Sequence, residues 1–367
     1  MRGGTSKGVF FHGRDLPADK PSRDALFLSV LGSPDPYGRQ LDGLGGGVSS
    51  LSKVAVIDPP SRPDADVDYT FGQVSVGEAL VDYGGTCGNL ASAVGPFAVD
   101  EGLVRATGDE AMVRIHAVNT GRIITARFRM ANGCAAVAGD LEIPGVAGTG
   151  AAIQLTFLEP GGASLLPTGS VIDAFQVPGF GLVRASLVDA ANACVFVAAD
   201  DLGLTGAEPP GTLDANGPVM AALEWLRAQA GVRMGRGATP EVVTRQSPGN
   251  PKVALVGPPA ASRLLNGQDV PESAMDVSLR MLSMGIAHKA APLTGALCLA
   301  VAARIGGTVV AQAARGGVGR VRVGTPSGVV PVDADVEWGD GWRARSASVY
   351  RTARRLMDGK VMVPRVD

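Results

Sequence analysis

GGTCGNLASAVGPFAV, residues 84–99, joins a glycine-flanked cysteine to a run of small, apolar residues. A helix that is apolar on all sides lies in the middle of a domain rather than on its surface. We therefore predict a central helix over 89–99, which the chain enters through the turn at Cys87. A second apolar segment, Ala290 to Ala303, predicts another central helix. Placing Cys87 over Pro292 aligns the two segments and indicates a faint internal repeat.

Strand-like segments separated by Gly, Pro and Asp turns precede and follow both predicted helices. The 367 residues exceed one ordinary core, which also favours two domains. We predict an α+β fold of two similar units, each a curled mixed sheet around its central helix. The boundaries are 1–179 and 180–345, with a segment 346–367 that packs back on the first unit. The predicted strands are Lys53–Ile57, Gln73–Val76, 113–118, 122–130, 181–188 and 194–198, and further helices are predicted over 22–31 and 219–229.

The composition excludes several classes of partner. The chain is 46% hydrophobic and 19% charged, with a net charge of −2, which is typical of a well-buried globular protein. This charge balance gives no footprint for nucleic acid or an anionic membrane, and 5% aromatic residues offer few stacking platforms. No apolar run is long enough to span a bilayer, and the N-terminus lacks the core of a signal peptide.

The cysteines and histidines argue against a metal site. Four cysteines are widely spaced without a CxxC pair, and only three histidines are present. Free thiols in a reducing cytoplasm are the simplest interpretation, so we expect a cytoplasmic protein.

Cys87 is the first candidate for chemistry. A thiol at a helix start lies among free N–H groups, which favour its reactive form and can hold an anion. A buried structural cysteine is the alternative. The glycines at 84, 85 and 88 favour a backbone that a ligand approaches closely.

Lys53 follows a serine cluster and begins an apolar strand. Desolvation on such a strand lowers the pKa of a lysine and makes it a usable base, whereas an ordinary strand-edge lysine is the alternative. Ser50 and Lys53 also fit the S-x-x-K motif of acyl-serine enzymes, but the partner motifs of that class are missing from the sequence.

Further polar residues suit the binding of a carboxylate. The loop Met1 to Gly8 carries two cations and two hydroxyls, and a frayed terminus is its alternative. Thr294 is a candidate cap of the second helix, with N–H groups behind it free to bind an anion. His288 lies upstream, although a lone histidine is more often structural. Arg280 is a candidate carboxylate clamp, and Ser327 lies in a turn with an available hydroxyl.

Together these segments resemble the PrpF-type isomerases of the diaminopimelate-epimerase-like superfamily. The matching stretches run in order along nearly the whole chain. They are MRGGTSKGVFF (1–11), GSPDPYGRQLDGLGG (32–46), SSLSKVAV (49–56), CGNLASAVGPFAV (87–99), NTGRI (119–123), LLPTG (165–169), SMGIAHKA (283–290), GTPSG (324–328) and RTARRLMDG (351–359).

The resemblance implies two epimerase-like domains with the active site in the cleft between them. Known members isomerise unsaturated di- and tricarboxylates, namely 2-methylaconitate, 3-methylitaconate and 4-oxalomesaconate, without a metal or an organic cofactor. It further implies a cytoplasmic homodimer, in a pathway with an aconitase-like enzyme as a possible partner.

The resemblance also assigns roles to residues of this chain. By motif, Lys53 matches the proposed base, and Cys87 matches the cysteine that the superfamily retains. The residues that it implies in substrate binding are Arg2, Gly3, Gly4, Thr5, Ser6, Ser52, Gly88, Asn89, Arg280, Ser283, Met284, Thr294, Gly295 and Ser327.

The chain departs from its superfamily at three places. Epimerases use two cysteines, one at each central helix, but the second position here is Pro292, which cannot exchange a proton. The family usually has a short strand before its MRGGTS motif, so we expect that a strand is missing before Met1. Thr325 replaces a histidine that many relatives carry, which leaves the substrate class open.

We therefore predict an enzyme that moves a proton across an allylic system of an unsaturated polycarboxylate. Lys53 is the base, and Cys87 is a second proton carrier or shapes the anion site. Two alternatives stay open: a keto–enol tautomerase of the oxalomesaconate type, and a non-catalytic tricarboxylate-binding accessory protein of an aconitase-like enzyme.

Overall fold

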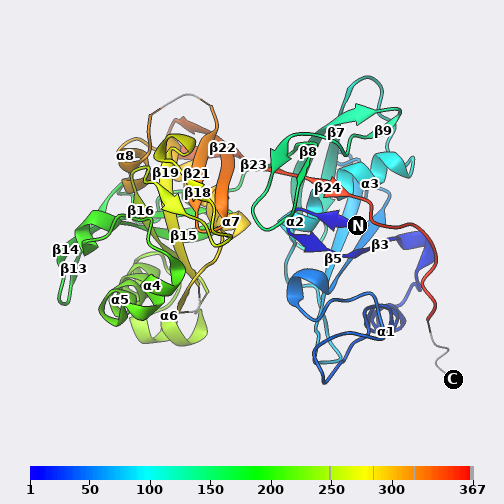
Figure 1. Ribbon diagram of the computed structural model, residues 1–367, viewed down its shortest axis with the longest axis horizontal. Coiled ribbons are helices and arrows are strands. Elements are labelled where there is room, and N and C mark those ends of the chain that lie inside the picture. The colour runs from blue at the N-terminus through cyan, green and yellow to red at the C-terminus, as the bar shows by residue number, and fades with distance from the viewer. Residues whose placement is uncertain (248, 284, 317–318, 364–367) are drawn as a thin grey trace. The chain divides into compact units, whose positions relative to one another are not determined.

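The computed structural model describes residues 1–247, 249–283, 285–316 and 319–363, and the chain divides into two compact units (Figure 1). Unit 1 contains Met1–Thr156 and Tyr350–Asp367, and unit 2 contains Phe157–Val349. The first boundary thus lies before the one predicted near 180. The reason is that the turns after Thr156 bond to unit 2, where the Ser186 hydroxyl donates to the carbonyl of Val171 at 2.5 Å.

Unit 1 is a mixed sheet in which parallel and antiparallel neighbours alternate. Strand β3 is parallel to β4, β4 antiparallel to β5, β5 parallel to β7, and β7 antiparallel to β8. The strands are β1 (Arg2–Gly3), β2 (Ser6–Lys7), β3 (Val9–His12), β4 (Lys53–Asp58), β5 (Val67–Val74), β6 (Val81–Asp82), β7 (Glu110–Ala117), β8 (Arg122–Ala131), β9 (Cys134–Ala135), β10 (Leu141–Glu142), β11 (Thr149–Gly150), β12 (Ile153–Leu158) and β24 (Ala353–Arg354).

The predicted central helix of unit 1 is broken into α2 (Gly88–Ala91) and α3 (Val94–Asp100). Ser92 and Ala93 keep right-handed helical backbone between them. Pro96 has no N–H, so the carbonyl of Ser92 loses its partner four residues on, which accounts for the break. Every residue from Val94 to Val99 is buried, as the apolar sequence predicts.

Helix α1 (Lys20–Leu31) covers part of the unit 1 sheet. Asp19 caps its start by accepting a hydrogen bond from Ser22 N at 2.8 Å, and it ends at Gly32, whose φ is 73°. Because this helix begins with a cap and a Pro, it starts two residues before the predicted 22–31. Phe27 of α1 belongs to the same apolar cluster as Val54 of β4.

Unit 2 repeats the order and directions of unit 1. Strand β15 is parallel to β16, β16 antiparallel to β19, β19 parallel to β21, and β21 antiparallel to β22. Its strands are β13 (Asp173–Val177), β14 (Gly181–Ala190), β15 (Asn192–Ala198), β16 (Lys252–Gly257), β17 (Ser262–Arg263), β18 (Asp269–Val270), β19 (Val277–Ser283), β20 (Ile286–Ala287), β21 (Val321–Thr325), β22 (Gly328–Trp338) and β23 (Trp342–Arg351).

The helices of unit 2 occupy the same places in the repeat. Helix α7 (Leu293–Arg304) is buried from Gly295 to Ala302 and with α8 (Val309–Ala313) comes before β21, as α2 and α3 come before β7. Helices α4 (Pro210–Ala215), α5 (Gly217–Arg233) and α6 (Pro240–Gln246) lie between β15 and β16, where unit 1 has α1. Helices α4, α5 and α6 pack together, and α7 lies beside β22 (Figure 1).

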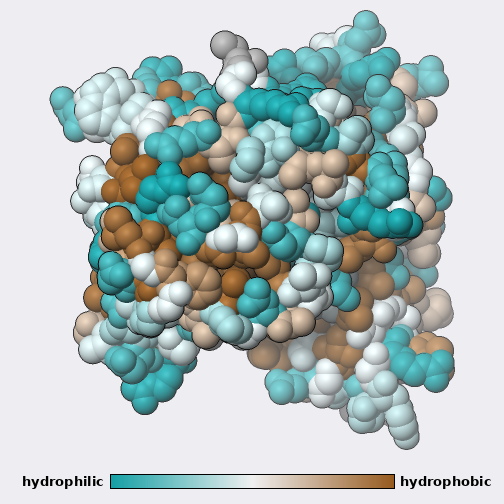
Figure 2. Space-filling view, turned by 60° about the vertical axis from the view of Figure 1, so that its left-hand side comes forward, coloured by the Kyte–Doolittle hydropathy of each residue, from teal (hydrophilic) through white to brown (hydrophobic). Residues whose placement is uncertain are grey.

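The surface mixes apolar and polar side chains. Figure 2 shows hydrophobic patches interrupted by hydrophilic ones on one face. Large exposed apolar side chains include Tyr37, Leu182, Ile286 and Trp338, and single exposed residues of this kind are ordinary in globular proteins. None of the helices in the described part of the chain is long and apolar enough to cross a membrane.

Candidate active site

Cys87 is the N-cap residue of α2, so the predicted helix start is confirmed. Its Sγ accepts a hydrogen bond from Leu90 N at 3.4 Å. The Ser6 hydroxyl oxygen lies 3.7 Å from the same sulfur, and the Tyr69 hydroxyl donates to the Cys87 carbonyl at 3.5 Å. The thiol therefore has two polar neighbours and stands at the end of the buried helical segment.

Lys53 is the first residue of β4 and its side chain is only 8% exposed. Its Nζ donates to Oε1 of Gln73 and lies 5.0 Å from the centroid of the Phe71 ring. Burial lowers the pKa of Lys53, and the charge of Cys87 opposes that shift in part. Within the described residues no carboxylate forms an ion pair with Lys53. The shift is towards the neutral amine, which is the form that accepts a proton.

Gln73 fixes the position of the Lys53 amine, and the sequence did not single it out. Its Nε2 donates to the carbonyls of Ser52 at 2.8 Å and Ser49 at 3.1 Å, which leaves Oε1 to face the lysine. Ser52 itself is fully buried, accepting from Gln40 Nε2 at 2.7 Å and donating to Val74 O at 2.9 Å. The Ser52 hydroxyl thus supports the strand start rather than a ligand.

The N-terminal loop is held in place by the far end of the chain. Gly4 N donates to Thr352 O at 2.9 Å, and Arg2 donates to the carbonyls of Gly4 and Thr352, each at 2.9 Å. Ser6 is buried and Thr5 is exposed. The loop is therefore ordered around its own backbone and not frayed, with Ser6 as its contact with Cys87.

Asn89 links this loop to the helix start. A Cβ on Gly3 would lie 2.7 Å from the Asn89 carbonyl oxygen, and one on Gly4 would overlap the Asn89 side chain, so both positions require glycine. Nε of Arg351, which is 6% exposed, donates to Asn89 Oδ1 at 3.0 Å. Burial lowers the pKa of Arg351 to about 10. Sequence analysis missed this residue because it stands 262 positions away.

In unit 2, Arg280 is tied to backbone carbonyls. It donates to Glu208 O at 2.6 Å, Ala207 O at 2.7 Å, Leu279 O at 2.9 Å and Gly324 O at 3.3 Å. Burial lowers the pKa of Arg280 to about 10, and the charge of Glu208 opposes that shift. Most of the guanidinium N–H groups therefore bond to backbone carbonyls, and Arg280 links neighbouring segments of unit 2.

The second helix start differs from its prediction. The N-cap of α7 is Pro292 and not Thr294, which lies on the second residue of the helix without capping it. Pro292 has an extended ψ of 138°, and its carbonyl accepts from Ala296 N at 2.9 Å. Pro292 therefore starts the helix although a proline has no backbone N–H. Gly295 packs closely against Met281. Cys87 and Pro292 thus hold the same N-cap position in the two units.

The repeat also pairs Lys53 with a residue that the sequence analysis passed over. Lys252 begins β16 as Lys53 begins β4, and both open the sequence Lys-Val-Ala. Burial lowers the pKa of Lys252, and burial followed by the charge of Lys252 lowers that of His288. Comparing KVAVID with KVALVG would have revealed this correspondence.

The remaining predicted binding residues of unit 2 have varied surroundings. The Ser327 hydroxyl donates to the carbonyl of Lys289, and the Thr325 hydroxyl donates to Gly328 O at 2.7 Å. Ser283 ends β19, where its backbone pairs with Ile286. Met284 lies outside the described residues. The structure therefore brings Gly3, Gly4, Ser6 and Asn89 together at the Cys87 turn, whereas the unit 2 candidates remain predictions.

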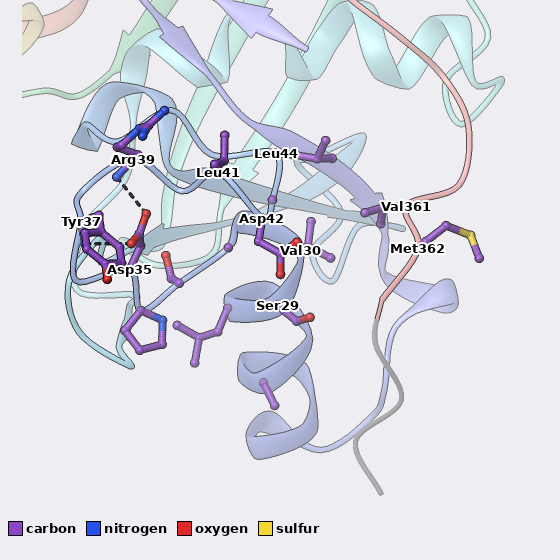
Figure 3. A pocket seen from close by; sticks show the side chains of 16 residues that line it. Ser29, Val30, Asp35, Tyr37, Arg39, Leu41, Asp42, Leu44, Val361 and Met362 are labelled. Atoms are coloured by element: carbon purple, nitrogen blue, oxygen red, sulfur yellow. Dashed lines mark hydrogen bonds between the residues drawn. The ribbon is translucent and has the colours of Figure 1, made fainter.

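Two pockets of unit 1 have linings that do not include Cys87. One, of about 900 Å³, lies over α1 and the loop that follows it (Figure 3). There Asp35 accepts from the backbone N–H groups of Tyr37 at 2.8 Å and Arg39 at 2.9 Å, a turn arrangement that holds the loop. The other, of about 860 Å³, includes Lys53 in its lining, with Phe97 and Arg355. Of the two residues proposed for catalysis, Lys53 therefore lines a pocket.

The donor set offers little to a metal ion. Among the residues that the structure describes, no group of three or more His, Cys, Asp or Glu side chains stands close enough to bind one.

The chain is similar to known proteins over its whole length. A family model described as "PrpF protein" matches residues 1–364. The chain is 43% identical to the 3-methylitaconate isomerase of Eubacterium barkeri, covering 99% of this chain and 96% of that protein. It is 41% identical to the 2-methyl-aconitate isomerase of Shewanella oneidensis, covering 100% and 96%.

A third relative and a solved structure extend the comparison. The 4-oxalomesaconate tautomerase of Pseudomonas putida is 41% identical, with 100% of this chain and 95% of that protein covered. The crystal structure of a methylitaconate-delta-isomerase superposes with a TM-score of 0.92 at 42% identity, covering 99% of this chain and 94% of that one. The α+β fold with its mixed sheets is thereby confirmed.

Proposed function

Because the chain belongs to the PrpF family, we propose that it is a cofactor-independent isomerase acting on an unsaturated di- or tricarboxylic acid of the 2-methylaconitate type. The reaction moves a proton across an allylic system, which changes the position or the cis–trans geometry of the double bond. The observation that carries the proposal is a buried lysine with a lowered pKa next to the Cys87 turn, in a chain that matches known isomerases over its full length.

Lys53 is the base of the proposed reaction. Its neutral amine takes a proton from the allylic carbon, so that the C–H bond breaks and an N–H bond forms. The electron pair moves into the conjugated system and places negative charge on the carboxylate oxygens. Gln73 holds the amine, and the Phe71 ring keeps water away from it. A positioned base of this kind contributes roughly 10²–10⁴-fold to a rate.

Return of a proton to the other end of the allylic system completes the reaction. Either the Lys53 ammonium delivers the proton to the same face, or the Cys87 thiol delivers one to another face. The intermediate has a single bond where the substrate had a double bond, so rotation there gives the cis–trans change. The second N-cap, Pro292, carries no exchangeable proton, which rules out a symmetric two-thiol racemase.

The carboxylates of the substrate bind, in this proposal, at the turn from Gly88 to Asn89 and at the loop from Arg2 to Ser6. Backbone N–H groups and the Ser6 hydroxyl stabilise the charge that develops on the carboxylate in the transition state. Ser283, Met284, Thr294, Gly295 and Ser327 of unit 2 are proposed as further substrate contacts, whereas the Arg280 guanidinium is engaged with backbone carbonyls.

A screen in deuterated water tests the function. Unsaturated di- and tricarboxylates, among them 2-methylaconitate, 3-methylitaconate and 4-oxalomesaconate, are incubated with the protein and followed by NMR. We expect deuterium in recovered substrate and in product for at least one acid. Preferred turnover of 4-oxalomesaconate would favour the tautomerase alternative, and binding without exchange would favour an accessory protein. Exchange of none of the acids would remove the proposal.

We further propose a cytoplasmic homodimer that works beside an aconitase-like enzyme. The free cysteines at 87, 134, 194 and 298 agree with a reducing compartment, and the dimer and the partner follow from the family resemblance. Sedimentation of the purified protein tests the dimer. Loss of growth on a precursor of the substrate, after deletion of this gene and of a neighbouring aconitase-like gene in turn, tests the partner.

A further inference from the structure

We propose that Arg351 is a positioning residue, which orients the side chain of Asn89 so that its amide N–H₂ group is presented to a carboxylate of the substrate. This inference rests on the proposed function and adds a residue to it. No motif in the sequence assigned Arg351 a role, because its partner is 262 positions away.

Arg351 is a buried cation without an anionic partner. It is 6% exposed, and in the described part of the chain no Asp or Glu forms an ion pair with it. Its hydrogen bonds go to Asn89 Oδ1 at 3.0 Å and Tyr350 O at 2.9 Å. Of the other buried arginines, Arg227 pairs with Glu224 at 2.7 Å, and Arg280 donates to backbone carbonyls. Burying such a cation is costly, and its bond to Asn89 Oδ1 offsets part of that cost.

The contact with Arg351 fixes which way the Asn89 amide faces. A guanidinium only donates, so the atom that faces it must be the oxygen of the amide and not the nitrogen. Nδ2 with its two hydrogens is therefore turned away from Arg351. Gly4 lies against the Asn89 side chain and leaves room for this orientation, because a Cβ there would overlap Oδ1.

Three segments far apart in sequence meet at this amide. The loop from Gly3 to Gly4 and the Cys87 turn contact Asn89 directly, and the end of β23 delivers Arg351. Thr352, the next residue, accepts the N–H of Gly4 at 2.9 Å. All of these contacts lie within unit 1. Asn89 is the second residue of α2, the helix that Cys87 caps. A carboxylate is the ligand that such donors and a nearby cation favour.

The test measures binding of tricarballylate, a saturated tricarboxylate that cannot undergo the allylic shift. Affinities of wild type, Asn89→Ala, Arg351→Met and the double variant are determined by calorimetry. We expect each single change to weaken binding by roughly 10–100-fold, the size of a lost charge-assisted hydrogen bond. The double variant should be no weaker than the weaker single variant by more than about threefold, because the two residues act as a unit.

Asn89→Asp separates orientation from stability. It keeps an oxygen for Arg351 and adds a charge pair, so the fold should be at least as stable as wild type. It also replaces the N–H₂ donor by an anionic oxygen, so tricarballylate binding should fall at least as far as in Asn89→Ala. A purely structural Arg351 predicts the opposite, that binding follows stability. Arg227→Met is the control for the loss of a buried arginine and should lower thermal stability without altering the dissociation constant.

Several results would overturn the inference. The inference fails if folded Arg351→Met binds tricarballylate with wild-type affinity. It also fails if the effects of the two single changes multiply, or if Asn89→Asp binds as tightly as wild type. If Arg351→Met does not fold, Asn89→Asp and Arg351→Lys decide the question, and Arg351→Lys should weaken binding because lysine lacks the Nε–H that faces Asn89. A wild type that exchanges substrate protons while these variants behave normally removes this inference alone. A wild type that neither binds nor exchanges any acid removes the proposed function as well.

Discussion

Gly4→Ala tests the packing that holds the site together. Gly4 is buried with φ of 52°, in the left-handed region, and a Cβ there would overlap Asn89 Oδ1 and lie 3.0 Å from Asn89 Cγ. Alanine therefore meets two obstacles, backbone strain and a clash with the one side chain that Arg351 holds. Gly121 supplies a matched control, because its φ is 67° and nothing lies within 4 Å of its Cβ position.

The structure sets the size of the two effects. Left-handed backbone costs a residue other than glycine about 1–2 kcal/mol, so Gly121→Ala should lose about that much stability. Gly4→Ala has the same strain and also displaces Asn89 from Arg351, and a hydrogen bond to a charged group is worth about 1.5–3 kcal/mol. We expect a total loss of about 3–5 kcal/mol for Gly4→Ala. The displaced amide should also weaken substrate binding.

The assay must distinguish the two units. All three tryptophans, Trp225, Trp338 and Trp342, lie in unit 2, so tryptophan fluorescence during urea unfolding reports that unit. Hydrogen exchange of peptides from residues 1–156 reports unit 1. Gly4→Ala should increase exchange in unit 1 peptides and leave the tryptophan transition in place. Proton exchange on the preferred acid, measured over a range of concentrations, then gives KM.

Equal behaviour of the two alanine variants would refute the reasoning. If Gly4→Ala and Gly121→Ala lost the same stability, the clash with Asn89 would have no energetic weight. If Gly4→Ala also kept the wild-type KM, the position of Asn89 would not matter for the substrate.

Five further outcomes test the site and its support. Lys53→Met should lower the exchange rate by roughly 10²–10⁴-fold, while Lys20→Met on the exposed start of α1 should leave it unchanged; full turnover in Lys53→Met would contradict the base assignment. The logarithm of kcat/KM should rise with pH and level off above the pKa of Lys53, because only the neutral amine accepts a proton and burial lowers that pKa below the ordinary 10.5; a profile that is flat or falls with pH would contradict it. The same shift makes the free energy of unfolding rise with pH between the lowered folded-state pKa and 10.5, since the unfolded chain binds the proton more tightly, and Lys53→Met should lack this rise in urea titrations at several pH values. Cys87→Ser should lose exchange at the second carbon if the thiol delivers that proton, whereas unaltered activity would leave Cys87 a structural role; NMR of the labelled positions decides. Gln40→Leu should cost about 2–4 kcal/mol in urea unfolding, because it abandons its hydrogen bonds to Ser33, Ser52 and two backbone N–H groups, and a loss below about 1 kcal/mol would contradict that support.

Sequence patterns located the elements that are buried throughout. The apolar run of β4 and the two helices around Val94 and Leu297 are almost entirely buried, so their hydrophobicity is uninterrupted and easy to read. Their limits were less accurate. Pro96 breaks the first helix, and the strand predicted at Gln73–Val76 is the end of β5, which stops at Val74. Caps and breaks depend on single residues, which periodicity does not weigh.

Other elements gave no usable pattern. Helices α4 and α6 have six and seven residues and follow a Pro start, too short for a helical period to stand out. Strands β19 and β21 of unit 2 were also absent from the sequence-based scheme, although the repeated order of strands makes them counterparts of β5 and β7. The repeat is preserved as topology after most of its sequence identity has been lost.

The candidate site was predictable in part. Lys53 and Cys87 follow from local motifs, because each begins an element and each carries chemistry. The supports could not be found in this way. Gln73 lies opposite Lys53 on the neighbouring strand β5. Arg351 bonds to Asn89 from the other end of the chain. The resemblance implied a binding role for Ser52, but its hydroxyl is hydrogen-bonded to Gln40 and to the Val74 carbonyl.

Unit 1 is built from both ends of the chain, with all of unit 2 between them. This order has a consequence for biosynthesis. Asn89 precedes Arg351 by 262 residues. Because a ribosome adds about 5–20 residues each second, Arg351 is synthesised roughly 10–50 s after Asn89. The nascent protein holds Lys53 and Cys87 long before it holds the strand that orders Asn89. The contact between Arg351 and Asn89 therefore forms only after all of unit 2 has been synthesised.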